Sequence, residues 1–145
     1  MDKLSLDNQI CFPLYALTRR ITGHYQPLLE ELDLTYPQYL VMLLLWETDR
    51  MNVKELGCRL QLDSGTLTPM LKRLEEKQML DRTRCKADER IVEITLTDKG
   101  KALKKEAKDI PSRLKCSLSV ADEDLIQLRD LLSRIHHKIS KHNSI

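Results

Sequence analysis

Glycine and proline are scarce in this sequence, which has 4 Gly and 5 Pro among 145 residues. A β-sandwich or barrel needs many glycine-rich turns, so this scarcity favours a mainly helical fold. Long apolar runs are also missing. The longest, residues 39–46, falls far short of the roughly 20 residues that a membrane span needs. No basic segment followed by an apolar one opens the chain, so secretion is not indicated. We expect a cytoplasmic protein without membrane contact.

Cysteine is sparse and widely spaced, and no Cys-x-x-Cys pair occurs. This spacing argues against a zinc ribbon and against a thioredoxin-type redox motif. In a cytoplasmic chain we expect four reduced thiols, at least two of them buried. The four are Cys11, Cys58, Cys85 and Cys116.

Net charge is only +2, but its distribution is uneven. Residues 50–105 contain 14 Lys+Arg and 9 Asp+Glu, a balance of +5, so the remainder carries 2 − 5 = −3. A basic middle segment is a modest indication of binding to a polyanion. With 41% hydrophobic residues the chain can bury a core, and its length fits one domain, residues 1–145.

Apolar residues three and four positions apart predict helices over residues 7–32 and 37–47. A capping box at Asn52 and Glu55 opens a helix ending near Leu60, and Asp63 or Ser64 caps the next, a helix-turn-helix. The period then changes to two, which predicts strands 80–84 and 91–96 joined by a charged tip. A helix from Asp98 toward Cys116 and a last helix opening at Ser119 complete a fold of about six helices plus a two-stranded wing.

The outer helices carry longer apolar stripes than a small winged module needs to cover itself. We therefore predict that residues 1–35 and 101–145 form a dimerisation layer in a two-fold homodimer. Residues 36–100 form the DNA-binding winged helix-turn-helix. A monomer that folds these helices back over the wing is the alternative.

This order of elements resembles the multiple-antibiotic-resistance regulator (MarR) family of winged-helix repressors. Residues 62–75, Leu-Asp-Ser-Gly-Thr-Leu-Thr-Pro-Met-Leu-Lys-Arg-Leu-Glu, followed by Asp88-Glu89-Arg90, look like that family's recognition helix and wing. Residues 8–15, Asn-Gln-Ile-Cys-Phe-Pro-Leu-Tyr, and 34–39, Leu-Thr-Tyr-Pro-Gln-Tyr, are similar to its organic-hydroperoxide-resistance repressors of the two-cysteine type. The resemblance implies a homodimer on pseudo-palindromic operator DNA that needs no cofactor.

Short hydroxyl residues followed by cations suit a helix that enters the major groove. Arg90 at the wing tip suits the narrow minor groove, and Asp88 is expected to orient it rather than touch DNA. Arg82 is a further plausible phosphate contact. The predicted DNA-binding residues are Ser64, Thr66, Thr68, Pro69, Lys72, Arg73, Arg84, Lys86, Asp88 and Arg90.

Cys11 lies near the start of the first predicted helix, where unpaired N–H groups and the helix dipole favour a thiolate. Tyr15 and Tyr25 share its helix face. Tyr25, however, lies fourteen residues or about 21 Å away, so it cannot touch Cys11 of its own chain. An antiparallel partner could bring its Tyr25 there.

The resemblance implies that the Cys11 thiolate accepts hydrogen bonds from Tyr25 and Tyr36 of the partner subunit. It also implies oxidation by organic hydroperoxide to a sulfenic acid, an intersubunit Cys11–Cys116 disulfide and release of DNA. We expect Cys116 to lie between the last two helices. Cys58 is expected to be partly buried and inert, and Cys85 to be exposed at the wing base, a possible side target of oxidation.

Three other interpretations stay open. A repressor of the same fold could respond to a small phenolic ligand, with a merely structural Cys11. It could instead respond to a metal, with ligands from the cysteines, His24, His136, His137 and His142, although the adjacent pair cannot share a helix face. A thiol peroxidase is the third, but it leaves the winged segment unexplained.

Overall fold

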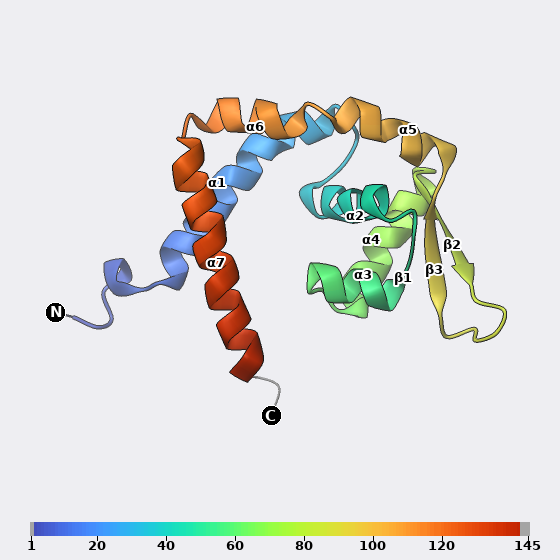
Figure 1. Cartoon of the computed structure of the whole chain (residues 1–145), viewed down its shortest axis with the longest axis horizontal. Helices are drawn as coiled ribbons and strands as arrows, with labels where there is room; N and C mark the ends of the chain where they lie inside the picture. The colour runs from blue at the N-terminus through green and yellow to red at the C-terminus, as the bar shows by residue number, and fades with distance from the viewer. Residues whose placement is uncertain (1, 143–145) are drawn as a thin grey trace. The chain divides into compact units, whose positions relative to one another are not determined.

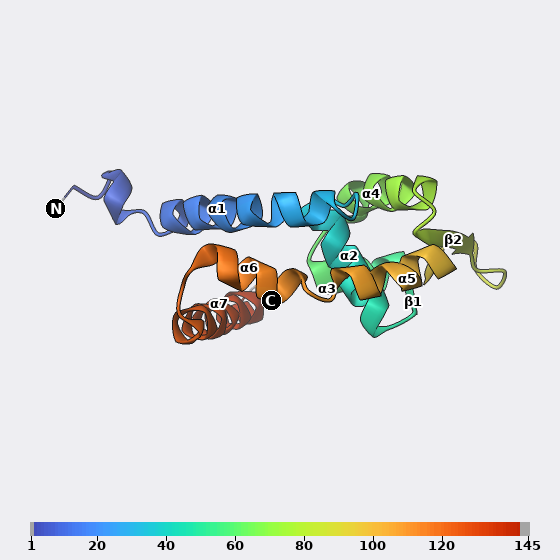
Figure 2. The same ribbon diagram turned by 90° about the horizontal axis from the view of Figure 1, so that it is seen from above.

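The computed structural model describes residues 2–142 and shows a mainly helical chain with one small antiparallel sheet (Figures 1 and 2). The chain forms two compact units, one ending at Ile110 and one beginning at Pro111. The first unit holds the helix-turn-helix and the sheet. Its core consists largely of leucines, and the fully buried side chains include Leu45, Leu56, Leu67, Leu71, Leu74, Leu80 and Ile94.

The first helix is shorter than the apolar stripe predicts. A 3-10 turn, η1 (Leu6–Asn8), is followed by Gln9 in an extended conformation, and α1 (Cys11–Glu30) begins only afterwards. Pro13 therefore lies in the first turn, where its missing N–H costs nothing. This correction makes Cys11 the first residue of α1, so its backbone N–H is one of the unpaired donors of the helix terminus.

Capping boxes open the next two helices. Thr35 and Gln38 bond reciprocally at the start of α2 (Tyr36–Glu47), and Asn52 and Glu55 do the same at the start of α3 (Val53–Leu60). Each box satisfies two otherwise unpaired donors and so fixes where the helix begins.

The helix-turn-helix joint depends on close backbone approach. α3 is followed by Gln61, whose φ of 56° is left-handed, and a Cβ on Gly57 would lie 2.7 Å from the Leu62 carbonyl oxygen. Glycine is therefore required at position 57. α4 (Ser64–Glu76) is capped by Asp63, which accepts a 2.7 Å bond from the Thr66 N–H, rather than by Ser64.

The sheet has three strands in the order β1-β3-β2, one more than predicted. β2 (Leu80–Arg84) and β3 (Val92–Leu96) form the expected hairpin, and β1 (Arg50–Asn52) pairs with the other edge of β3. β1 therefore anchors the wing to the segment between α2 and α3. Figure 1 shows α2, α3 and α4 grouped beside this sheet.

The helix predicted from Asp98 to Cys116 is two helices, α5 (Asp98–Ala107) and α6 (Ile110–Leu118). Pro111 is the second residue of α6 and donates no N–H, so it suits the first turn of a new helix better than the interior of a continuous one. Cys116 lies inside α6 and not between the last helices. Ser119 has a left-handed φ of 52°, and α7 (Asp122–His142) opens three residues later than predicted.

Candidate DNA interface and redox site

The predicted recognition residues lie along α4. Its buried positions 67, 71 and 74 face the core, which turns the opposite side of the helix outward. Thr68 is half-buried. The remaining predicted residues of this helix are exposed: Ser64, Thr66, Pro69, Lys72 and Arg73.

A cleft of about 580 Å³ separates α4 from the wing. Of the predicted residues, it brings together Ser64, Thr68, Lys72, Arg82, Arg84 and Arg90. Asn52 and Lys54, from the start of α3, also line it. Sequence reasoning missed these two, because the capping box alone did not show that α3 begins at the cleft.

The expected pairing of Asp88 with Arg90 is present at the wing tip. The Arg90 Nε donates to Asp88 Oδ1 over 3.0 Å and its Nη2 to Oδ2 over 3.1 Å. These bonds from Arg90 lower the pKa of the Asp88 carboxyl. The Arg90 side chain is nevertheless 91% exposed, so the guanidinium is oriented but open to a ligand.

Arg82 also lines the cleft, where its guanidinium and its backbone are bound by Glu75. Its Nη2 donates to Glu75 Oε1 over 3.1 Å, and its backbone N–H donates to Glu75 Oε2 over 3.0 Å. Glu75 therefore fastens β2 to α4, and the bonds from Arg82 lower its pKa. Arg84 and Lys86 are exposed; the Arg84 Nη1 donates to the Glu89 carbonyl over 3.0 Å.

Three tyrosines form a ring cluster where α1 meets α2. The ring centroids of Tyr25 and Tyr36 lie 4.9 Å apart, and those of Tyr25 and Tyr39 lie 5.7 Å apart. Burial, with smaller contributions from Tyr36 and Tyr39, raises the pKa of Tyr25 to about 12. All three phenols therefore stay protonated at neutral pH and can donate hydrogen bonds. Tyr39 was not predicted as a member of this cluster.

Tyr15 stands apart from the cluster. It is exposed, and the Arg19 guanidinium lies 5.4 Å from its ring centroid. Cys11, one turn before Tyr15, is also exposed. Cys11 and Tyr25 are fourteen positions apart on one continuous helix, which holds these two side chains apart within one chain.

The burial predicted for the cysteines was wrong. Cys58 is exposed, because it follows the buried Leu56 by two residues and so lies on the opposite face of α3. Cys85 is half-buried in the hairpin loop, where its N–H donates to the Ile91 carbonyl over 2.8 Å. Cys116 is exposed. None of the four is fully buried.

In the part of the chain from residue 2 to residue 142, no three His, Cys, Asp or Glu side chains are grouped as metal ligands would be. None of the helices in that range combines the length and hydropathy that a membrane-spanning segment requires.

Comparison with known proteins decides the family. Residues 24–107 match the family described as transcriptional regulator SarA/Rot. Over 141 residues the chain is 49% identical to the organic hydroperoxide resistance transcriptional regulator of Bacillus subtilis strain 168. The aligned residues cover 94% of this chain and 96% of that protein. The chain belongs to the MarR/SarA family of winged-helix transcriptional regulators. The resemblance inferred from the recognition-helix, wing and residue 8–15 motifs is thereby confirmed.

Solved structures of this family agree with the fold. Reduced AbfR bound to DNA is 37% identical to this regulator, with a TM-score of 0.76 over 92% of this chain and 93% of AbfR. A disulfide-formed AbfR has a TM-score of 0.67 at 36% identity, over 90% and 91% of the two chains. AbfR is a protein of Staphylococcus epidermidis.

Proposed function

We propose that this regulator is a homodimeric repressor that binds operator DNA while Cys11 is reduced and releases it when an organic hydroperoxide oxidises Cys11. The observation that carries the DNA-binding part is the cleft between α4 and the wing. It gathers cations and hydroxyl groups from three elements on one side of the molecule. Because the ligand is operator DNA, the protein acts in the cytoplasm.

Direct readout suits the early turns of α4. Ser64, Thr66 and Thr68 are short enough to meet base edges in the major groove, while Lys72 and Arg73 are long enough to meet phosphates. Arg90 extends from the wing toward the adjacent minor groove, where a narrow groove concentrates negative potential. Arg84 and Lys86 contribute phosphate contacts.

Uncovered apolar side chains support the homodimer. On the first twenty residues, Ile10 is 73% exposed, and Phe12, Leu14 and Leu17 are exposed as well. α7 exposes Ile126, Leu131, Leu132, Ile135 and Ile139. A monomer rarely leaves rows of large apolar side chains uncovered in water, so a second copy of the chain is the natural cover for each of these two segments.

The redox chemistry begins at Cys11. The thiolate attacks the terminal oxygen of the hydroperoxide and the O–O bond breaks. The alkoxide that leaves takes a proton from solvent, so the products are a Cys11 sulfenic acid and an alcohol. Tyr25 and Tyr36 of the partner subunit donate hydrogen bonds to the thiolate before the reaction, and Tyr15 supports it from the same chain. The Cys116 thiol then displaces water from the sulfenic acid, which gives an intersubunit disulfide.

Sulfur oxidation serves here as a signal and not as catalytic turnover. Two relatives fit this interpretation. One is named for organic hydroperoxide resistance, and the other, AbfR, has been solved in a reduced form bound to DNA and in a disulfide form. The disulfide rearranges the dimer and changes the spacing of its two recognition helices, which no longer match half-sites one turn apart.

A gel shift tests this proposal. Reduced protein is first used to select a duplex from a random library, and binding is then measured before and after cumene hydroperoxide, and again after dithiothreitol. We expect binding, release and recovery, and a Cys11→Ser variant that binds but does not release. Release from Cys11→Ser, or turnover of hydroperoxide by the wild type with a thiol reductant, would contradict the proposal.

A further inference from the structure

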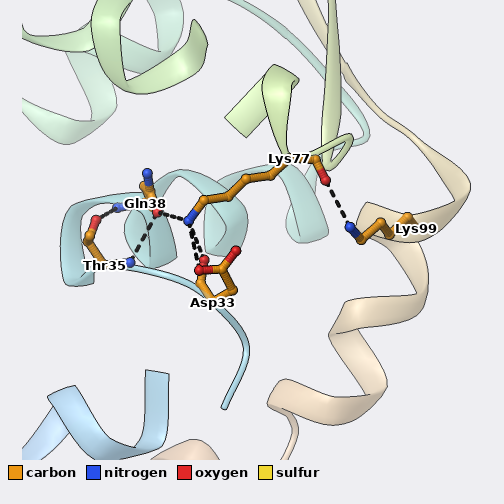
Figure 3. A network of polar contacts seen from close by, with 5 residues as sticks. All are labelled: Asp33, Thr35, Gln38, Lys77 and Lys99. Carbon is orange, nitrogen blue, oxygen red and sulfur yellow. Dashed lines mark hydrogen bonds and ion pairs between the residues drawn. The ribbon is translucent and has the colours of Figure 1, made fainter. Parts of the chain in front are cut away.

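The C-terminal end of α4 is held to the segment between α1 and α2 by one side chain, that of Lys77. Its Nζ donates to the Asp33 carbonyl and to Gln38 Oε1 over 3.3 Å, and it pairs with Asp33 Oδ1 over 3.3 Å (Figure 3). Gln38 is only 4% exposed. Lys77 thus connects two segments 44 residues apart in the sequence.

The residues that receive Lys77 flank Tyr36. Gln38 belongs to the capping box with Thr35, and Tyr36 is the first residue of the helix that this box opens. Asp33 has a left-handed φ of 54°, a conformation that Asp adopts more readily than most non-glycine residues. A movement of Tyr36 therefore moves the acceptors of Lys77, because all of them lie within three residues of it.

The corner after α4 is also fixed from α5. Lys99 Nζ donates to the Lys77 carbonyl over 2.9 Å, and Thr97 Oγ1 donates to the Gln78 carbonyl over 2.6 Å. A Cβ on Gly100 would lie 2.0 Å from the Met79 carbonyl oxygen, so this corner has no free space on that side. A displacement passed to Lys77 is therefore transmitted along α4.

From these contacts we infer that Lys77 is the positioning residue that couples the tyrosine cluster to the recognition helix. The inference rests on the proposed redox function. When oxidation of Cys11 removes the acceptor of the Tyr36 phenol, Tyr36 shifts, Asp33 and Gln38 shift with it, and Lys77 draws the end of α4 out of its DNA-binding position. Coupling between two sites in one protein typically changes affinity about 5–150-fold.

The Lys77–Asp33 ion pair contributes little to folding, which makes substitution informative. The Asp33 side chain is 79% exposed, so solvent screens the pair although the Lys77 side chain is only 27% exposed. The core positions of α4 hold the winged module together without this pair. Lys77→Met should therefore fold and bind DNA when reduced.

DNA affinity is measured for reduced and for hydroperoxide-treated protein, with Cys11 oxidation followed by mass spectrometry. For Lys77→Met we expect reduced affinity within about threefold of wild type, unchanged Cys11 oxidation, and a loss of affinity on oxidation below about threefold. Lys77→Arg, which keeps charge and donors, restores the response. Lys105→Met, an exposed lysine of α5, is the matched control and responds as wild type.

Asp33→Asn is a second variant that keeps the carbonyl acceptor and removes the ion pair, and it should weaken the response partially. Two results for Lys77→Met would refute the coupling role while the proposed function stood. One is a loss of DNA affinity on oxidation as large as that of wild type. The other is a DNA affinity lower than that of wild type by the same factor in the reduced and in the oxidised state. If wild type itself kept its affinity after oxidation, the proposed function would fail and this inference with it.

Discussion

Removal of the Arg90 side chain should weaken DNA binding without affecting the fold. The guanidinium bonds only to Asp88 in the described structure, two residues away, and it lies at an exposed tip. Each neutralised phosphate contributes about 0.9 to the slope of log K against log salt concentration. A two-fold dimer carries two copies of Arg90, so Arg90→Ala should reduce the slope by about 1.8. At about 0.15 M salt this change corresponds to a loss of about 30-fold in DNA affinity, or about 2 kcal/mol of binding free energy.

Fluorescence anisotropy of a labelled duplex is measured at salt concentrations between about 0.05 and 0.3 M, on either side of the physiological concentration of about 0.15 M. The titrations give the affinity and its salt dependence together. Arg129→Ala is a matched control: Arg129 also pairs with a neighbouring carboxylate, Asp130, at 3.2 Å on an exposed surface, but it lies on α7. The control should match wild type. If Arg90→Ala kept both the slope and the affinity of wild type, Arg90 would not contact DNA and the wing would have another role.

Three further outcomes are expected. Burial raises the pKa of Tyr25 from 10 to about 12, so between these pH values the folded state keeps a proton that the unfolded state loses. The contribution of Tyr25 to the free energy of unfolding should therefore be constant below pH 10. From pH 10 to 12 it should fall by up to about 1 kcal/mol per pH unit. Urea unfolding at pH 9 and pH 11 checks this, and Tyr25→Phe should flatten the decline. Gly100→Ala should lower stability by about 1–3 kcal/mol in thermal denaturation, since its Cβ would meet the Met79 carbonyl; an unchanged melting temperature would show that this corner is not closely packed. Cys116→Ser should abolish the cross-linked dimer on non-reducing gels after peroxide treatment, and persistence of that band would point to Cys85 instead.

Local sequence signals predicted the winged module well. The capping box at Asn52 and the Asp63 cap of α4 fix helix starts through bonds between residues three apart, so they are readable without tertiary information. The second hairpin strand was equally readable, because the alternation of apolar and polar residues over 92–96 places one face toward the core.

Features that depend on distant segments escaped prediction. β1 has three residues and no periodicity, and it is a strand only because the edge of β3 pairs with it. The tyrosine cluster needed the packing of α1 against α2 before Tyr39 could be placed in it. The burial of Cys58 and Cys85 was misjudged because sequence gives the helix or hairpin but not which of its faces meets solvent.

The roles of individual side chains were the hardest to predict. Arg82 and Arg84 have the same charge and lie two residues apart on β2, yet only Arg82 is bound by Glu75. Lys77 gave no signal in the sequence at all, since its partners lie 39 and 44 residues away.

The sole tryptophan of the chain lies next to the tyrosine cluster. The Trp46 indole donates from Nε1 to the Gly100 carbonyl over 2.9 Å, and its ring packs edge-on against Tyr39 with centroids 6.4 Å apart. Light absorbed by the tyrosines can therefore pass to the indole of Trp46, which lies on α2 and is bonded to α5. The molecule thus contains its own optical probe, through which changes around the phenols can be followed in real time without an attached dye.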